Sequence, residues 1–163
     1  MQYLMKQKLF ALGDDFTIQD ASGKDAFFVD GRAFSLGAKL SFQDMQHNEL
    51  AFIQQKLLAW GPTYELYHQG ELMAVVKKQL FTLFHCAFTI TEPSAADLHA
   101  EGNLTDHEYT FTRDGATIGQ VSKQWFTWTD SYGVDIADPA DAVLLLASTV
   151  VIDMACHGDG QRR

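Results

Sequence analysis

The chain has 163 residues, of which 47% are apolar and 20% charged, as is typical of one globular domain with a substantial core. Its 12 Lys and Arg against 21 Asp and Glu give a formal net charge of −9. This charge argues against a nucleic-acid partner, because binding to phosphate backbones normally requires a basic surface.

The first residues do not match a secretory signal, because Lys6 and Lys8 interrupt any apolar run. Cys86 and Cys156 each lie among apolar or aromatic neighbours, which favours reduced thiols. We therefore expect a cytoplasmic protein with a single domain over residues 1–163.

Three tight hairpin turns are predicted between short runs rich in Phe, Val, Ile, Tyr and Thr. Each turn contains a glycine that can take the required positive φ, namely Gly23, Gly70 and Gly115. These glycines recur at nearly equal intervals, so residues 1–138 are predicted to form three similar units. Each unit has room for roughly four strands. About twelve strands are more than one flat sheet usually carries, so the sheet should curl or close.

The segment from Pro139 to Cys156 is predicted to be a buried C-terminal helix. Asp138 is a good N-cap, and Pro139 suits the first helical position. Between Asp141 and Asp153 the residues are apolar on all sides, and this stretch is shorter than the roughly 20 residues of a membrane span. The predicted fold is therefore β-rich (α+β), a closed or nearly closed antiparallel barrel of ~12 strands around this helix. Residues 157–163 are expected to be a flexible tail.

Several stretches carry a resemblance to a known family: residues 5–10 with 13–14, 34–37 with 39–41, 48–51 with 55–57, 102–103 with 107–109, and 122–126 with 130–136. In these stretches the chain resembles the LURP-one-related family over nearly its whole length. The resemblance implies a tubby-like barrel. It implies no catalytic motif and no cofactor. The structural relatives of the family include the tubby proteins, which bind phosphoinositides, and the phospholipid scramblases.

Histidines and acids near residue 100 offer a weak candidate metal site. The residues are His99, Glu101, Asp106, His107 and Glu108. Their spacing matches no zinc signature, and Gly102 with Asn103 predicts a hairpin turn between them. We expect no metal and no enzymatic activity. A metal-dependent enzyme that uses His99 and His107 stays an alternative.

Four acids before the C-terminal helix occupy the place of the acidic loop that scramblases carry: Asp130, Asp135, Asp138 and Asp141. An EF-hand-like loop that starts at Asp130 would need oxygen ligands where the chain has Tyr132 and Val134. A calcium site is therefore not favoured, and a scramblase-like, lipid-handling protein is kept as an alternative function.

The lysines carry the leading functional hypothesis. Six of the eight lie in segments expected to be strands, namely Lys6, Lys8, Lys56, Lys77, Lys78 and Lys123. If those strands are neighbours, the lysines form a basic strip on an acidic protein. Alternatively, they keep the outer faces of the strands soluble. We expect a non-enzymatic binding module that recognises anionic phospholipid headgroups or a protein partner on the outer surface of the barrel.

Overall fold

The computed structural model describes residues 1–6, 15–32, 37–79, 87–125 and 131–157. Within these ranges the chain forms twelve strands, a 3-10 turn and one helix. The strands are β1 Gln2–Lys6, β2 Phe16–Asp20, β3 Asp25–Arg32, β4 Lys39–Asp44, β5 Glu49–Gln55, β6 Thr63–His68, β7 Glu71–Gln79, β8 Ala87–Thr91, β9 Leu98–Asn103, β10 Glu108–Arg113, β11 Ala116–Ser122 and β12 Ser131–Ile136. They are followed by the 3-10 turn Pro139–Asp141 and the helix α1 Ala142–His157.

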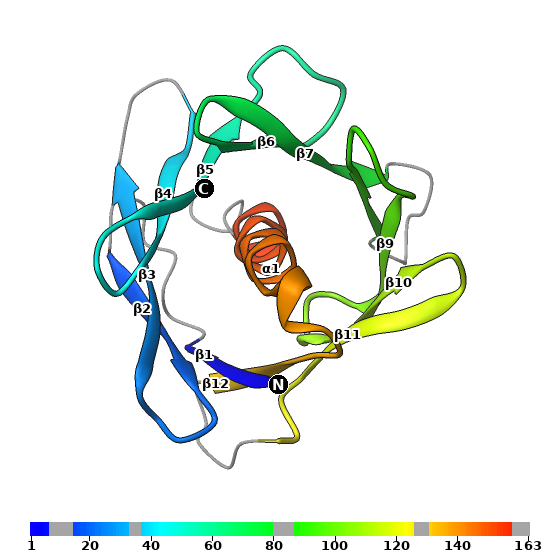
Figure 1. The fold of residues 1–163 in the computed structure, drawn as a ribbon. Helices are drawn as coiled ribbons and strands as arrows, with labels where there is room; N and C mark the ends of the chain where they lie inside the picture. Colours follow the sequence, from blue (N-terminus) through cyan, green and yellow to red (C-terminus); the bar gives the residue numbers. More distant parts are fainter. Residues whose placement is uncertain (7–14, 33–36, 80–86, 126–130, 158–163) are drawn as a thin grey trace.

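The strands form one closed antiparallel barrel in which each strand pairs with its neighbours in the sequence. The first and last strands close it, with Gln2 opposite Asp135 and Lys6 opposite Ser131. Figure 1 looks along the barrel and shows α1 running through its centre. The predicted closed barrel of twelve strands around a C-terminal helix is therefore confirmed.

The predicted hairpin turns lie between β2 and β3, β6 and β7, and β10 and β11. Their glycines, Gly23, Gly70 and Gly115, have φ values of 83°, 83° and 78°. A side chain is strained in this left-handed region, which explains why glycine occupies these positions.

The barrel has two unlike ends. At one, the hairpin end, the even-numbered strands finish and tight turns such as β2–β3 and β6–β7 connect them to the next strand. At the other, the loop end, the odd-numbered strands finish and connections such as β5–β6 begin. Because β12 finishes at the hairpin end, α1 starts there and runs toward the loop end.

The start of the helix has the predicted capping residues. The Asp138 side chain accepts a hydrogen bond of 2.9 Å from the backbone N–H of Ala140, although the first turn is 3-10 rather than α. α1 ends at His157, one residue later than predicted.

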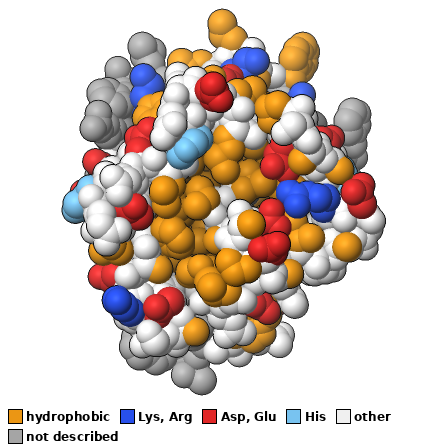
Figure 2. All heavy atoms as spheres, in the orientation of Figure 1, with side chains coloured by type: hydrophobic (Ala, Val, Ile, Leu, Met, Phe, Trp, Pro, Cys, Tyr) orange, Lys and Arg blue, Asp and Glu red, His pale blue; other side chains and the backbone are white. Residues whose placement is uncertain are grey.

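The apolar segment is a core helix. The 18 residues from Pro139 to Cys156 have a mean hydropathy of 1.7, enough for a membrane span by composition, yet 67% of them are buried inside the barrel. Inward-facing strand residues such as Phe42, Phe88 and Phe111 are completely buried in the same core. In the view along the barrel, apolar side chains gather near the centre and many charged side chains lie farther out (Figure 2).

Candidate functional site

The candidate lysines within the described ranges all lie at the loop end of the barrel. Lys6 ends β1, Lys56 follows β5, Lys77 and Lys78 lie near the end of β7, and Lys123 follows β11. Lys8 lies outside the described residues. Among the described lysines, only Lys24 lies at the hairpin end, in the β2–β3 turn.

These lysines do not form one continuous strip. In the barrel order, β1 and β11 flank β12 on one side, whereas β5, β6 and β7 are consecutive on the opposite side. Lys6 and Lys123 therefore belong to one group, and Lys56, Lys77 and Lys78 to another. Two of the lysines expected in strands also lie outside them. β5 ends at Gln55, just before Lys56, and β11 ends at Ser122, just before Lys123.

Lys56, Lys77 and Lys78 are brought together by the pairing of β6. Lys77 is directly opposite Thr63 in the β6–β7 ladder. The backbone N–H of Lys56 donates a hydrogen bond of 2.8 Å to the Thr63 carbonyl, and that of Lys78 donates one of 3.0 Å to the Pro62 carbonyl. The backbones of the three lysines thus lie around the base of the β5–β6 loop, which we define as residues 56–62. Lys77 and Lys78 point to opposite faces of β7, and Lys77 is the exposed one.

This β5–β6 loop presents apolar side chains to solvent. Leu57, Leu58 and Trp60 are 56%, 97% and 87% exposed. Figure 1 shows the loop projecting from the barrel wall between β5 and β6, and Figure 2 shows apolar side chains at that edge with basic ones beside them. This exposed apolar loop is not among the sites expected from the sequence.

The sequence around these lysines contains few acids, and the one in the adjoining strand is Glu65 of β6, which lies opposite Val75, two residues from Lys77 in β7. The segments 54–64 and 75–91 have no Asp or Glu in the sequence, although they include all three lysines. Within the described ranges, none of the three ammonium groups forms an ion pair. This part of the rim therefore carries more lysines than acids, on a protein whose net charge is −9.

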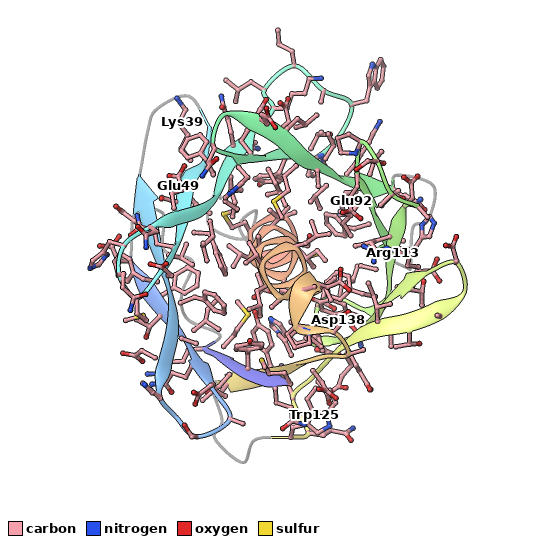
Figure 3. All side chains as sticks on the ribbon, in the orientation of Figure 1. Lys39, Glu49, Glu92, Arg113, Trp125 and Asp138 are labelled. Carbon is pink, nitrogen blue, oxygen red and sulfur yellow. The ribbon has the colours of Figure 1, made fainter. Side chains whose placement is uncertain are left out.

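More of the described acids lie at the hairpin end than at the loop end. Those at the hairpin end lie in and beside its turns and include Asp20, Asp25, Asp44, Glu49, Glu71, Glu92, Asp114, Asp138 and Asp141. Those toward the loop end include Asp15, Asp30, Glu101, Asp106 and Glu108. Arg113 at this end is neutralised, because its guanidinium contacts Glu92 at 2.8 Å and Asp141 at 3.4 Å (Figure 3). The charge of the barrel is thus distributed unevenly along its axis.

The acids considered for calcium have other partners. Asp135 contacts the N-terminal ammonium of Met1 at 3.3 Å, Asp138 caps the helix start, and Asp141 contacts Arg113. Asp130 lies outside the described residues. The described acids therefore have structural roles that account for their positions.

A buried polar cluster lies inside the barrel around Asp153, near the C-terminal end of α1. Asp153 Oδ1 is 3.1 Å from His107 Nε2, and the Tyr132 hydroxyl donates to the other carboxylate oxygen. The His107 and Tyr132 rings stack with their centroids 4.2 Å apart. Burial, together with the Asp153 carboxylate, raises the pKa of Tyr109 and of Tyr132 well above the ordinary value. Because all four side chains are almost completely buried, this cluster fixes the helix against the barrel wall.

The two histidines of the metal hypothesis lie on opposite faces of the barrel wall. His107 faces the core, whereas His99 is half-buried between the inward-facing Leu98 and Ala100 of β9 and so points outward. The described residues contain no group of three His, Cys, Asp or Glu side chains that could hold a metal ion. Gly102 and Asn103 lie at the end of β9, and the predicted turn follows them at residues 104–107.

The comparisons with known proteins agree with this fold. A sequence model of the LURP-one-related family matches residues 1–153. The chain is 35% identical over 160 residues to the uncharacterized protein YxjI of Bacillus subtilis (strain 168), covering 98% of this chain and 96% of that protein. An X-ray structure of a protein from Arabidopsis thaliana superimposes with a TM-score of 0.66 at 13% identity, covering 94% of this chain and 90% of the other. At 13% identity, the similarity to the plant protein supports the fold alone.

Proposed function

The chain belongs to the LURP-one-related family, and from the surface of its barrel we propose that it is a non-enzymatic module that docks on the anionic surface of a phospholipid membrane. The observation that carries this proposal is the position of Lys56, Lys77 and Lys78. They stand together at the loop end, in a part of the sequence without acids.

The interior of the barrel supports a function on the outer surface. α1 and the residues packed around it occupy the interior, so a ligand is expected to bind at a rim or on the wall. The two rims differ in charge, because more of the described acids lie at the hairpin end and more of the described lysines at the loop end. An anionic membrane would attract the loop end and repel the hairpin end, which would orient the docked protein.

The expected contribution of these lysines can be bounded. A lysine close to an anionic leaflet contributes about 1 kcal/mol to binding, so the exposed Lys56 and Lys77 together contribute about 2 kcal/mol. That corresponds to a change of about 30-fold in the partition coefficient. The attraction should weaken as salt rises, because the Debye length at physiological ionic strength is only about 8 Å.

Co-sedimentation with vesicles tests the proposal. The full chain should bind vesicles of phosphatidylcholine with phosphatidylserine or a phosphoinositide, should release them as salt rises, and should ignore phosphatidylcholine alone. The variant Lys56→Gln/Lys77→Gln should lose most of the binding. The variant Lys6→Gln/Lys123→Gln is the matched control, because it removes the same charge from the opposite side of the rim. If the wild type does not bind anionic vesicles at low salt, the proposed function is wrong and the exposed loop is better assigned to a protein partner.

A further inference from the structure

The β5–β6 loop carries an apolar surface that the barrel itself does not use. Leu58 and Trp60 are the most exposed large apolar side chains among the described residues, at 97% and 87%. Side chains of this size usually contribute to a core, and adjoining exposed ones mark interaction surfaces. The lysine hypothesis does not account for them.

The hydrogen bonds that position the β5–β6 loop lie at its base, where it leaves and rejoins the barrel wall. Besides the hydrogen bonds from Lys56 and Lys78, the Thr63 hydroxyl donates to the Gly61 carbonyl at 3.3 Å. Gly61 has a φ of 77°, a conformation that L-residues rarely adopt. The backbone thus holds the tip of the loop, with Leu58 and Trp60, away from the core.

A second contact ties the loop to the neighbouring connection between β3 and β4. A Cβ atom at Gly37 would lie 2.9 Å from Cδ2 of Leu57, so this leucine packs directly on the glycine backbone. The Gln55 side chain accepts a hydrogen bond of 3.2 Å from the backbone N–H of Ala38. Leu57 therefore fastens the loop to the barrel and leaves Leu58 and Trp60 for an external partner.

We infer that this loop is a membrane anchor, in which Leu58 and Trp60 insert into the interfacial layer of an anionic bilayer. The inference rests on the proposed docking function and adds an apolar contact to it. Tryptophan prefers the level of the lipid headgroups, because its ring is apolar and its N–H is polar. The lysines around the base of the loop would then lie at the height of the lipid phosphates.

A pair of matched variants separates apolar insertion from charge attraction. Leu58→Gln/Trp60→Gln keeps every lysine and should weaken binding to phosphatidylserine vesicles roughly tenfold to a hundredfold, since the apolar burial is lost. The control Met45→Gln/Leu72→Gln changes two exposed apolar residues at the hairpin end, and its binding should equal that of the wild type. Leu58→Gln/Trp60→Gln should melt like the wild type, because the replaced side chains are 97% and 87% exposed. The control replaces side chains that are 38% and 42% exposed, so its melting is measured alongside its binding.

Fluorescence reports the insertion directly. The chain has 3 tryptophans, and Trp60 is the one in the anchor. Its emission should shift to shorter wavelength on phosphatidylserine vesicles and should be quenched by brominated lipid, and Trp60→Phe should remove both effects. The soluble headgroup glycerophosphoserine should produce neither effect, because it offers no apolar layer.

The outcomes distinguish this inference from the proposed function. If the lysine variant loses binding but Leu58→Gln/Trp60→Gln does not, the protein docks by charge alone and the anchor is wrong. An unchanged fluorescence shift in Trp60→Phe would also overturn it. If the wild type binds no anionic vesicles, the proposed function and the anchor both fail. Loss of binding in Lys56→Gln/Lys77→Gln and in Leu58→Gln/Trp60→Gln, together with quenching of Trp60 by brominated lipid, supports both the proposed function and the anchor.

Discussion

The contact between Leu145 of α1 and Gly119 of β11 offers a sensitive test of how the helix sits in the barrel. A Cβ atom at Gly119 would lie 2.9 Å from Leu145 Cδ1, whereas ordinary contacts are 3.4–4 Å. Leu145 itself is completely buried. Gly119→Ala and Leu145→Ala should therefore each destabilise the protein, and the second change should relieve the first.

The magnitudes follow from packing. Leu145→Ala removes a buried leucine and should cost about 3 kcal/mol of unfolding free energy, whereas Gly119→Ala alone should cost about 1–2 kcal/mol through overpacking. In the double variant Cδ1 is absent, and the nearest remaining atoms are Phe111 Cδ2 at 3.3 Å and the Asp135 carbonyl oxygen at 3.5 Å. The new methyl group then fills part of the cavity, so the coupling energy should be about 1 kcal/mol or more.

Thermal and denaturant unfolding of the four proteins measure this coupling. For a chain of this size each kcal/mol shifts the Tm by roughly 2–4 °C, so Leu145→Ala should lower it by roughly 6–12 °C. The control pairs Gly119→Ala with Val150→Ala, a change at another fully buried residue of α1 that is not among the atoms nearest Gly119. If the effects of Gly119→Ala and Leu145→Ala simply add, as they should in the control, the helix does not pack against β11 as described.

Three further predictions concern the buried cluster and a glycine at the end of β9. His107→Leu should cost about 3 kcal/mol in unfolding experiments, because it leaves the buried Asp153 carboxylate without its imidazole partner, and His107→Gln should cost less. The unfolding free energy should fall as pH rises above about 10. In that range the unfolded chain releases phenolic protons that Tyr109 and Tyr132 keep when folded. Tyr132→Phe should make the melting temperature depend less on pH. Gly102→Ala should lower the unfolding free energy by about 2 kcal/mol. The φ of Gly102 is 139°, and the new Cβ would lie 2.6 Å from the Glu108 carbonyl oxygen. An unchanged melting temperature would contradict this geometry.

The fold was predictable because its signals are local. The turn glycines recur at positions that need a positive φ, and the Asp138-Pro139 pair marks a helix start that any sequence reader can recognise. Closure of the barrel could be expected because about twelve strands are more than one flat sheet usually carries. Its seam, where β1 pairs with β12, joins distant parts of the chain and could be expected only through the family resemblance.

The candidate site was harder to predict because it depends on which residues the fold leaves uncovered. Leu58 and Trp60 have the composition of a core segment, and only the structure shows that the loop carries them away from the barrel. Asp153 shows the opposite case. From the sequence, this residue is expected only to end an apolar run. In the structure it is completely buried, with His107 and Tyr132 on the barrel wall as its partners.

The closure of the barrel has a consequence for biosynthesis. Met1 and Asp135, which the seam brings within 3.3 Å, are 134 positions apart in the chain, and the helix that completes the core follows both. At about 5–20 residues per second, the first strand waits on the order of 10 s for its partner to emerge from the ribosome. During that time the inward faces of the finished hairpins have no helix to cover them. We therefore expect the nascent chain to need chaperones until its last residues are made, and slowly translated messages to yield more aggregate.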